Sequence, residues 1–171
     1  MATYMIPCLL GLEKLVGDEV RRLGLGNVQV ENGRVFCQGT EADCARLNIN
    51  LRCGARVLLV LGQFPARSFE ELFQGTKQLP WEEYIPTDGK FWVAKAASVK
   101  SKLFSPSDIQ SIMKKAIVER LKGCYNVSWF KEDGASYPLR VIIHKDVVTI
   151  GLDTTGDSLH KRGYRPVAGK A

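Results

Sequence analysis

Residues 26–38 read GNVQVENGRVFCQ, and this stretch has the pattern of a β-hairpin. Two short segments, 28–31 and 34–38, carry the alternation of apolar and polar side chains that is typical of half-buried strands. Asn32-Gly33 stands between them, and Asn-Gly favours a two-residue type I′ turn because both central positions need positive φ. The stretch therefore predicts two antiparallel strands joined through Asn32-Gly33.

The segments on either side of this hairpin complete a symmetrical order of elements. Residues 3–8 read as a strand and 12–24 as an amphipathic helix before it, and 41–51 reads as a helix and 55–64 as a strand after it. The order β-α-β-β-α-β is that of a ferredoxin-like unit, in which two helices pack on one face of an antiparallel sheet. We therefore expect the α/β (α+β) class.

Several residues have the types expected at helix ends. Thr40 precedes the helix at 41–51 as an N-cap, and Gly54 follows it where a left-handed C-cap residue is needed. Ser68 is expected to cap the next helix, with Glu71 as the reciprocal residue of a capping box.

The second half of the chain has the pattern of another α/β layer. It predicts a helix after Ser68, a turn of helix around Trp81, a strand at 91–98, a helix at 106–122, and strands at 139–145 and 147–155 joined through Lys145-Asp146. Ser105 is the expected N-cap of the helix at 106–122, and Gly123 is expected to end it. Three regions follow from this pattern: a ferredoxin-like domain at 1–66, a second α/β domain at 67–156 and a basic connector at 157–171.

Charge and composition narrow the class of protein. The net charge is +6, and residues 67–171 hold 17 Lys and Arg against 12 Asp and Glu, whereas residues 1–66 hold 7 against 6. No apolar run approaches the roughly 20 residues of a membrane helix, so we expect a soluble, cytoplasmic protein. Five cysteines without a CxxC pair, together with only two histidines, predict reduced thiols and no metal site.

The sequence offers no arrangement typical of an active site. His144 lies on an expected strand and His160 lies beside two basic residues, so neither forms an evident base for a nucleophile. The glycines of LGLGN at 23–27 follow a helix rather than a strand, which is wrong for a nucleotide loop. We therefore expect no catalytic and no cofactor-binding residue in this chain.

The stretch KFWVAKAASVKSKLFSPSD at 90–108 interleaves lysines with aromatic residues. Lysines along a strand and loop that end at a helix N-terminus suit a phosphate backbone, although the same lysines could serve only solubility. RNA is favoured over duplex DNA because no helix carries the Arg, Asn and Gln array that reads a major groove. An acidic protein surface or an anionic membrane stays open as a partner on charge alone.

Several motifs together resemble one family: GLEKLVGDEV, NLRCGARVLL, LPWEEYIP, LRVIIHKDVVTIGLDTTG and, most specifically, LDTTGDSLHKRGYRP. The chain resembles the N-terminal part of the bacterial THUMP-containing RNA methyltransferases, related to enzymes that methylate the exocyclic amine of guanine in large-subunit ribosomal RNA. The resemblance implies a ferredoxin-like domain and an RNA-binding THUMP domain, with the basic segment leading to an S-adenosylmethionine-dependent catalytic domain. The catalytic Asn-Pro-Pro or Asp-Pro-Pro motif of that domain does not occur here, so no catalytic role transfers.

On this resemblance we expect structured RNA, ribosomal rather than transfer RNA, and the protein's own methyltransferase domain as partners. The candidate RNA-binding residues are Lys95, Lys100, Lys102, Lys114, Lys115, Lys161, Arg162 and Arg165. Two alternatives stay open: a stand-alone RNA-binding adaptor, and a docking domain for an acidic protein. THUMP domains also accompany thiolation enzymes, but the connector motif favours methylation.

Overall fold

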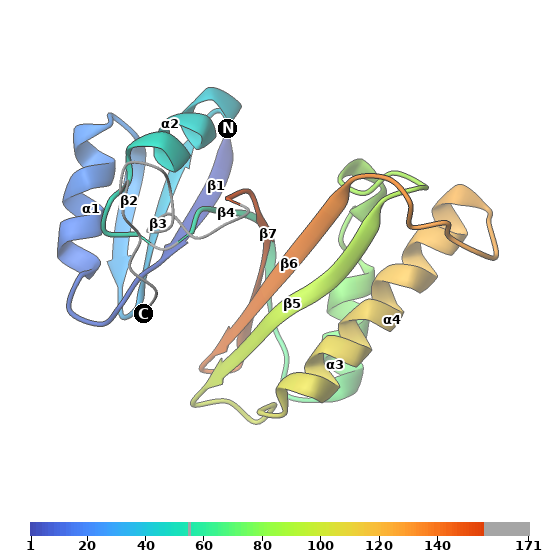
Figure 1. The fold of residues 1–171 in the computed structure, drawn as a ribbon. Helices are drawn as coiled ribbons and strands as arrows, with labels where there is room; N and C mark the ends of the chain where they lie inside the picture. The colour runs from blue at the N-terminus through green and yellow to red at the C-terminus, as the bar shows by residue number, and fades with distance from the viewer. Residues whose placement is uncertain (55, 156–171) are drawn as a thin grey trace, which may run out of the picture. The chain divides into compact units, whose positions relative to one another are not determined.

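The computed structural model describes residues 1–54 and 56–155, which fall into two units (Figure 1). Of the described residues, the first unit holds 1–54, 56–60 and 153–155, and the second is Leu61–Leu152. The expected connector at 157–171, with Lys161, Arg162 and Arg165, lies outside the described residues.

The first unit is a ferredoxin-like layer. Its elements are β1 (Ala2–Pro7), α1 (Glu13–Arg22), β2 (Gly26–Glu31), β3 (Arg34–Gly39), α2 (Glu41–Asn50) and the first residues of β4 (Leu58–Pro65). The strand order is β2-β3-β1-β4, and the pairs β2–β3, β3–β1 and β1–β4 are antiparallel. The predicted order of elements and the α/β class are therefore confirmed.

The core of this unit lies between the two helices and one face of the sheet. Tyr4 and Ile6 of β1 are register partners of Cys37 and Val35 of β3, and all four side chains are buried. They face the apolar sides of α1 and α2, which contribute Val16, Val20, Leu47 and Leu51. Alternate strand residues supply this layer, as a strand period of two requires.

The turn and the helix ends of the first unit match the sequence predictions in part. The Asn32-Gly33 hairpin is confirmed, although only Gly33 has positive φ (78°). Thr40 caps α2 as predicted, because its hydroxyl accepts a hydrogen bond from the Asp43 N–H while the Asp43 carboxylate accepts the Thr40 N–H. Gly54 is not the C-cap: α2 ends at Asn50 and is followed by Leu51 in an extended conformation.

Close packing explains a glycine at position 54. A Cβ atom built there would stand 2.7 Å from Cγ2 of Ile6, a fully buried side chain of the central strand. Such a distance is far below van der Waals contact, so any side chain would displace β1. Gly54 therefore serves close backbone approach rather than helix termination.

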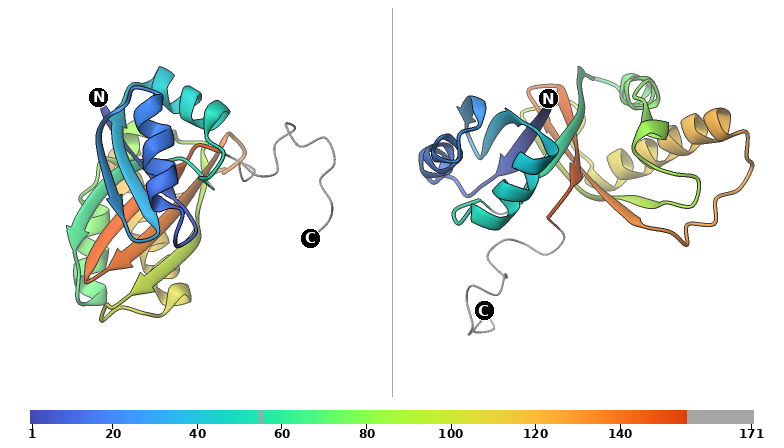
Figure 2. Two further views of the ribbon diagram at one scale, coloured as in Figure 1. Left: turned by 90° about the vertical axis from the view of Figure 1, so that its left-hand side faces the viewer. Right: turned by 90° about the horizontal axis from the view of Figure 1, so that it is seen from above.

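The second unit is a sheet of four strands that carries its helices on one face (Figures 1 and 2). Its elements are the remainder of β4, α3 (Phe69–Lys77), the 3-10 helix η1 (Trp81–Glu83), β5 (Lys90–Val99), α4 (Pro106–Tyr125), β6 (Ser136–His144) and β7 (Val147–Asp153). The strand order is β4-β7-β6-β5, with β5 parallel to β6 and β6 antiparallel to β7. The core is formed by α3 and α4 against Phe91, Val93, Leu139, Val141, Ile143, Val148 and Ile150.

Helix ends in this unit depart from the sequence predictions at three points. Ser68 caps α3 through the Glu71 N–H, but the Glu71 carboxylate accepts the N–H of Arg67 and the capping box stays half-formed. Ser105 precedes α4 without a side-chain cap bond. Gly123 does not end α4, which continues to Tyr125.

The extension of α4 beyond Gly123 has a visible cause. The Tyr125 hydroxyl donates to the backbone carbonyls of Glu82 and Ile85, at 3.0 and 2.6 Å, and so ties the last turn to the 3-10 helix η1. Asn126 then ends the helix with a left-handed φ of 52°. Asparagine is the residue that most readily replaces glycine in that conformation.

Candidate nucleic-acid interface

At one end of the second unit's sheet, Asp146 links the β6–β7 turn to the loop that follows β5. The Asp146 carboxylate accepts the backbone N–H of Lys102 at 2.9 Å, and the Asp146 N–H donates to the Ser101 hydroxyl at 3.0 Å. The backbone N–H of Lys145 donates to the carbonyl of Val99 at 3.1 Å. The β6–β7 turn and the loop between β5 and α4 are therefore held side by side.

Three residues of these loops have left-handed backbone conformations. Lys145 and Asp146 both have positive φ, 49° and 63°, as the two central residues of a type I′ turn require. Lys100 also has positive φ, 50°, directly after β5. The hairpin through Lys145-Asp146 is confirmed, and it carries the conformation that was predicted for Asn32-Gly33.

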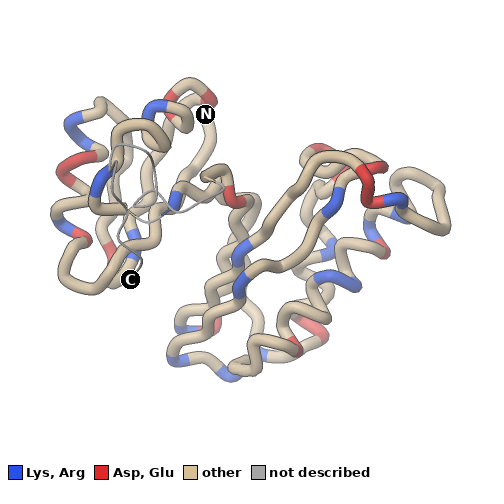
Figure 3. Tube along the Cα trace, in the orientation of Figure 1, with Lys and Arg blue, Asp and Glu red and all other residues tan. Residues whose placement is uncertain are grey.

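Four cations gather around Asp146, and we call this group the basic rim: Arg67, Lys100, Lys102 and Lys145. All four are exposed, and among the described residues only Arg67 lies within ion-pair distance of a carboxylate, with Nε 3.6 Å from Oδ2 of Asp146. The segments that meet at Asp146 therefore carry four cations and this carboxylate, which leaves the loop end positive. In Figure 3 several basic positions of the second unit lie at this end of β5 and β6, and others lie along the strands and on α4.

Lys95 lies on the sheet face opposite α3 and α4 because of a bulge in β5. Phe91 and Val93 point into the core, and strict alternation would send Lys95 in the same direction. The β5–β6 register shifts between Val93 and Lys95, so that Lys95 becomes the register partner of Arg140 and is exposed. The bulge thus places a cation on the same face as Trp92.

Lys114 is held by the protein itself. Its ammonium donates to the Phe91 carbonyl at 2.6 Å and to the Glu132 carboxylate at 2.8 Å, and it lies 3.6 Å from the centroid of the Phe91 ring. One turn earlier on α4, the side-chain amide of Gln110 donates to the Val93 carbonyl at 2.9 Å. A four-residue step on a helix, about 6 Å, matches a two-residue step on a strand, about 6.6 Å. Lys114 and Gln110 therefore cover outward carbonyls of the edge strand β5.

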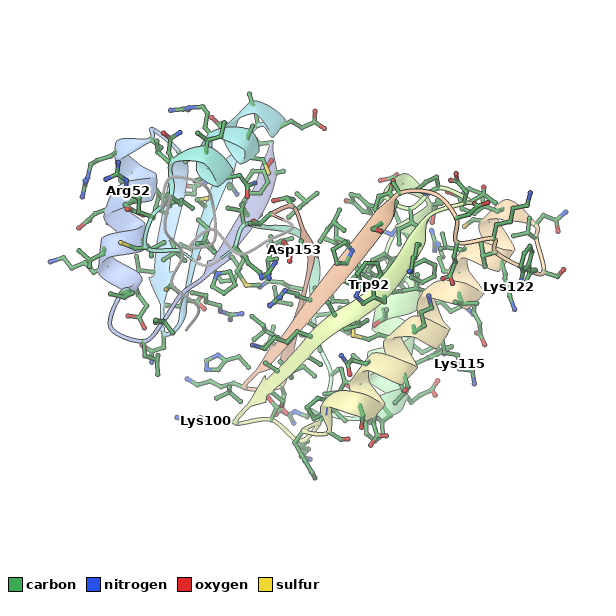
Figure 4. All side chains as sticks on the ribbon, viewed as in Figure 1. Arg52, Trp92, Lys100, Lys115, Lys122 and Asp153 are labelled. Atoms are coloured by element: carbon green, nitrogen blue, oxygen red, sulfur yellow. The ribbon has the colours of Figure 1, made fainter. Side chains whose placement is uncertain are left out.

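The remaining candidate lysine lies apart from the rim. Lys115 is exposed on α4, as is Lys122, whereas Lys100 lies at the end of β5 (Figure 4). The structure therefore brings together Lys100 and Lys102, places Lys95 on the helix-free sheet face and separates both from Lys115. It adds Arg67 and Lys145, which the sequence reading did not select, although Lys145 stands in the turn that the sequence did predict.

The described residues offer no sign of an alternative, catalytic or metal-binding site. No group of three or more His, Cys, Asp or Glu residues in ranges 1–54 and 56–155 could hold a metal ion. All five cysteines are free, and burial raises the pKa of the Cys37 thiol to about 12, which keeps it protonated. Across these two ranges, no helix has both the length and the apolar surface that crossing a bilayer would require.

A surface hollow of the first unit is a second candidate for an anion site. It is lined by Glu19, Arg22, Leu23, Asn50 and Arg52, so it combines two guanidinium groups with a carboxylate. It lies at the C-terminal ends of α1 and α2, where the helix dipoles favour cations. The two arginines are suited to neutralising those helix ends, and the hollow is a poor site for phosphate.

The geometry defines a class: a ferredoxin-like domain that precedes an α/β domain with a basic rim. Residues 3–58 match the family described as "RlmL ferredoxin-like domain", and residues 66–153 match the "THUMP domain" family. The chain therefore belongs to the THUMP-domain proteins, in the arrangement with an RlmL-type ferredoxin-like domain before the THUMP domain.

The relatives have names from RNA modification. The chain is 44% identical over 172 residues to "Putative RNA methyltransferase YpsC" of Bacillus subtilis strain 168, and 33% identical over 178 residues to "Ribosomal RNA large subunit methyltransferase K/L" of Psychromonas ingrahamii. These matches take in 99% and 100% of this chain, but 44% and 23% of the relatives. The crystal structure of "a possible methylase" from Clostridium difficile 630 superposes with a TM-score of 0.92 at 48% identity, over 96% of this chain and 44% of that one. The chain thus spans less than half the length of these relatives.

Proposed function

We propose that this chain is the RNA-binding part of an RNA methyltransferase, and that it holds structured RNA for a catalytic domain. The observation that supports this most is the basic rim of the THUMP domain, a set of exposed cations on two loops fixed by Asp146. The names of the relatives favour large-subunit ribosomal RNA as the substrate. By the same resemblance, the modified group is the exocyclic amine of guanine, and the protein acts in the cytoplasm.

The chemistry of the rim suits a phosphate backbone. Lysine side chains at the end of a loop can follow phosphates without reading bases, and this recognises the shape of an RNA rather than its sequence. Lys95, Lys100 and Lys102 are the proposed contacts of the described residues, joined by Arg67 and Lys145. Lys115 is a secondary proposal because it lies on α4, and Lys114 has internal partners. Lys161, Arg162 and Arg165 stay proposals from the sequence.

S-adenosylmethionine is the methyl donor that the whole protein would use, and the described residues do not fit it. The turn between β1 and α1 is where a cofactor loop would stand, but the Glu13 carboxylate accepts the N–H groups of Gly11 and Gly33 there, at 2.8 and 3.0 Å. These amides are therefore not available to a ligand. We assign the cofactor and the catalytic residues to another part of the protein.

The proposal is tested by measuring binding of the chain to a ribosomal RNA hairpin, a transfer RNA and a DNA duplex across a salt series. The expected result is preference for the ribosomal hairpin, with log affinity falling by about 0.7–0.9 for each phosphate contact per log unit of salt. Equal or negligible binding to all three would overturn RNA binding and favour docking to an acidic protein. If the chain binds RNA strongly but its natural reading frame encodes no methyltransferase domain, the adaptor alternative would be favoured.

A further inference from the structure

The helix-free side of the THUMP sheet carries an exposed tryptophan. Trp92 on β5 is 38% exposed, although its neighbours Phe91 and Val93 are buried in the core. It is the register partner of Pro138 on β6. An exposed tryptophan on a sheet presents a large, rigid apolar area that another flat ring can contact.

The residues around Trp92 form a surface of mainly apolar side chains with one pair of basic residues, Lys95 and Arg140, across its middle. We call it the open face, and it consists of Trp92, Lys95, Ala97 and Val99 of β5 with Pro138, Arg140, Ile142 and His144 of β6. On β5, Trp92, Lys95 and Val99 are exposed and Ala97 is half-buried, and the four residues on β6 are half-buried. The face runs along β5 from Trp92 to Val99, next to Lys100 of the basic rim.

Cations stand close to the Trp92 ring along the strand. The Lys90 ammonium lies 5.9 Å from the centroid of the ring, and Lys95 follows on the same face through the β5 bulge. An aromatic ring with cations on the strand beside it has the composition of surfaces on which unpaired bases stack while their phosphates are neutralised. Bases in a double helix are stacked on one another and cannot reach such a ring.

We propose that the open face binds an unpaired RNA segment and that one of its bases stacks on Trp92. This inference rests on the proposed function, because it assigns a substrate feature to the same RNA-binding domain. It assigns different parts of the RNA to two surfaces: the basic rim contacts phosphates of the structured part, and the open face binds the single-stranded nucleotides next to that part. The structured RNA is therefore expected to carry a loop or flank within reach of β5.

The test compares two RNAs that share one hairpin stem, of which only one carries a short unpaired extension. Affinities are measured for the unaltered chain, for Trp92→Ala and for Trp92→Phe. Trp129→Ala is the matched control, because Trp129 is also exposed (71%) but follows α4 and is not part of the open face. In a Trp129→Phe background, quenching of the fluorescence by RNA reports contact with Trp92, since the other remaining tryptophan, Trp81, is fully buried and no base can reach it.

Stacking on Trp92 predicts that Trp92→Ala weakens binding of the extended RNA by about 5- to 150-fold, the effect of losing one stacked base. The stem without the extension should be bound almost unchanged, Trp92→Phe should restore most of the affinity, and Trp129→Ala should have no effect. The extended RNA should also quench Trp92 fluorescence. The rescue by phenylalanine distinguishes stacking from a folding defect.

Three results would overturn the inference. Equal affinities of Trp92→Ala and Trp129→Ala for the extended RNA would mean that Trp92 contacts no base. If the stem were still bound in a salt-sensitive way, the proposed function would nevertheless remain valid. Equal weakening of both RNAs by Trp92→Ala would show a general effect on the domain rather than stacking. Absence of binding by the unaltered chain to either RNA would remove the proposed function as well.

Discussion

Replacing Lys114 by methionine separates a structural lysine from a phosphate-binding one. The Lys114 ammonium is held by the Phe91 carbonyl, the Glu132 carboxylate and the Phe91 ring. Methionine keeps the length and apolar stem of the side chain but removes all three polar contacts. The edge carbonyl of β5 then loses its charged donor.

The expected loss of stability can be estimated contact by contact. A hydrogen bond from a charged donor contributes about 1.5–3 kcal/mol, and the lower value applies because the Lys114 side chain is 37% exposed. The contact with the Phe91 ring adds about 0.5 kcal/mol, and the pair with Glu132 adds little because both side chains are exposed and screened. The free energy of unfolding should fall by about 2 kcal/mol.

Urea unfolding, followed by circular dichroism, measures this difference. With an m value of about 1.5 kcal/mol/M, the midpoint of the transition should fall by about 1.3 M. Lys115→Met is the matched control: its side chain is exposed and forms no hydrogen bond or ion pair with the described residues, so its midpoint should change by less than about 0.3 M.

The same variant also has an expected result in RNA binding. Because the Lys114 ammonium already has internal partners, Lys114→Met should leave the salt dependence of RNA affinity unchanged. Equal urea midpoints for Lys114→Met and Lys115→Met would refute the edge-covering role. A shallower salt dependence for Lys114→Met would show that Lys114 contacts phosphate.

Two further predictions concern an ion pair and the glycines. The Arg120 guanidinium, which donates two hydrogen bonds to the Glu82 carboxylate, lowers the pKa of Glu82 from 4.5 to about 2. This ion pair therefore stabilises the fold above about pH 4.5, and its contribution is lost as the pH falls toward 2. The urea midpoint of Glu82→Gln should lie below that of the unaltered chain at neutral pH, and the two midpoints should converge at low pH. A pH-independent difference would contradict this. Gly54→Ala should lower the free energy of unfolding by about 1–3 kcal/mol because its Cβ would meet Ile6, whereas Gly123→Ala, within α4 and with open space around it, should raise it by about 0.5–1 kcal/mol. Urea midpoints in which Gly54→Ala is the more stable variant would contradict the packing argument.

The element order was accessible to sequence reasoning because it depends on periodicity and on local turn residues. Asn32-Gly33 and Lys145-Asp146 are both hairpin turns in the structure. The ends of elements were less accessible. Gly123 has the right type to end a helix, but α4 continues because Tyr125 reaches the carbonyls of Glu82 and Ile85, which lie about 40 residues away in the chain.

The candidate site could be predicted as a charge pattern but not as a surface. Nothing in the sequence places the register shift between Val93 and Lys95, since bulges depend on pairing with β6. That shift decides that Lys95 joins Trp92 on the open face. The internal role of Lys114 could not be predicted from the sequence either, because it depends on the packing of α4 against the edge strand β5.

The central claim, that the basic rim binds RNA phosphates, is tested most directly by the salt dependence of ribosomal RNA hairpin binding. The double substitution Lys100→Glu with Lys102→Glu changes the rim, and Lys122→Glu with Lys131→Glu makes the same change of charge at two exposed lysines that are not proposed contacts. If each rim lysine neutralises one phosphate, the first variant should reduce the slope of log affinity against log salt by about 1.4–1.8, and the second should leave it nearly unchanged. Equal slopes for the two variants would contradict the assignment of the rim as the RNA-binding site.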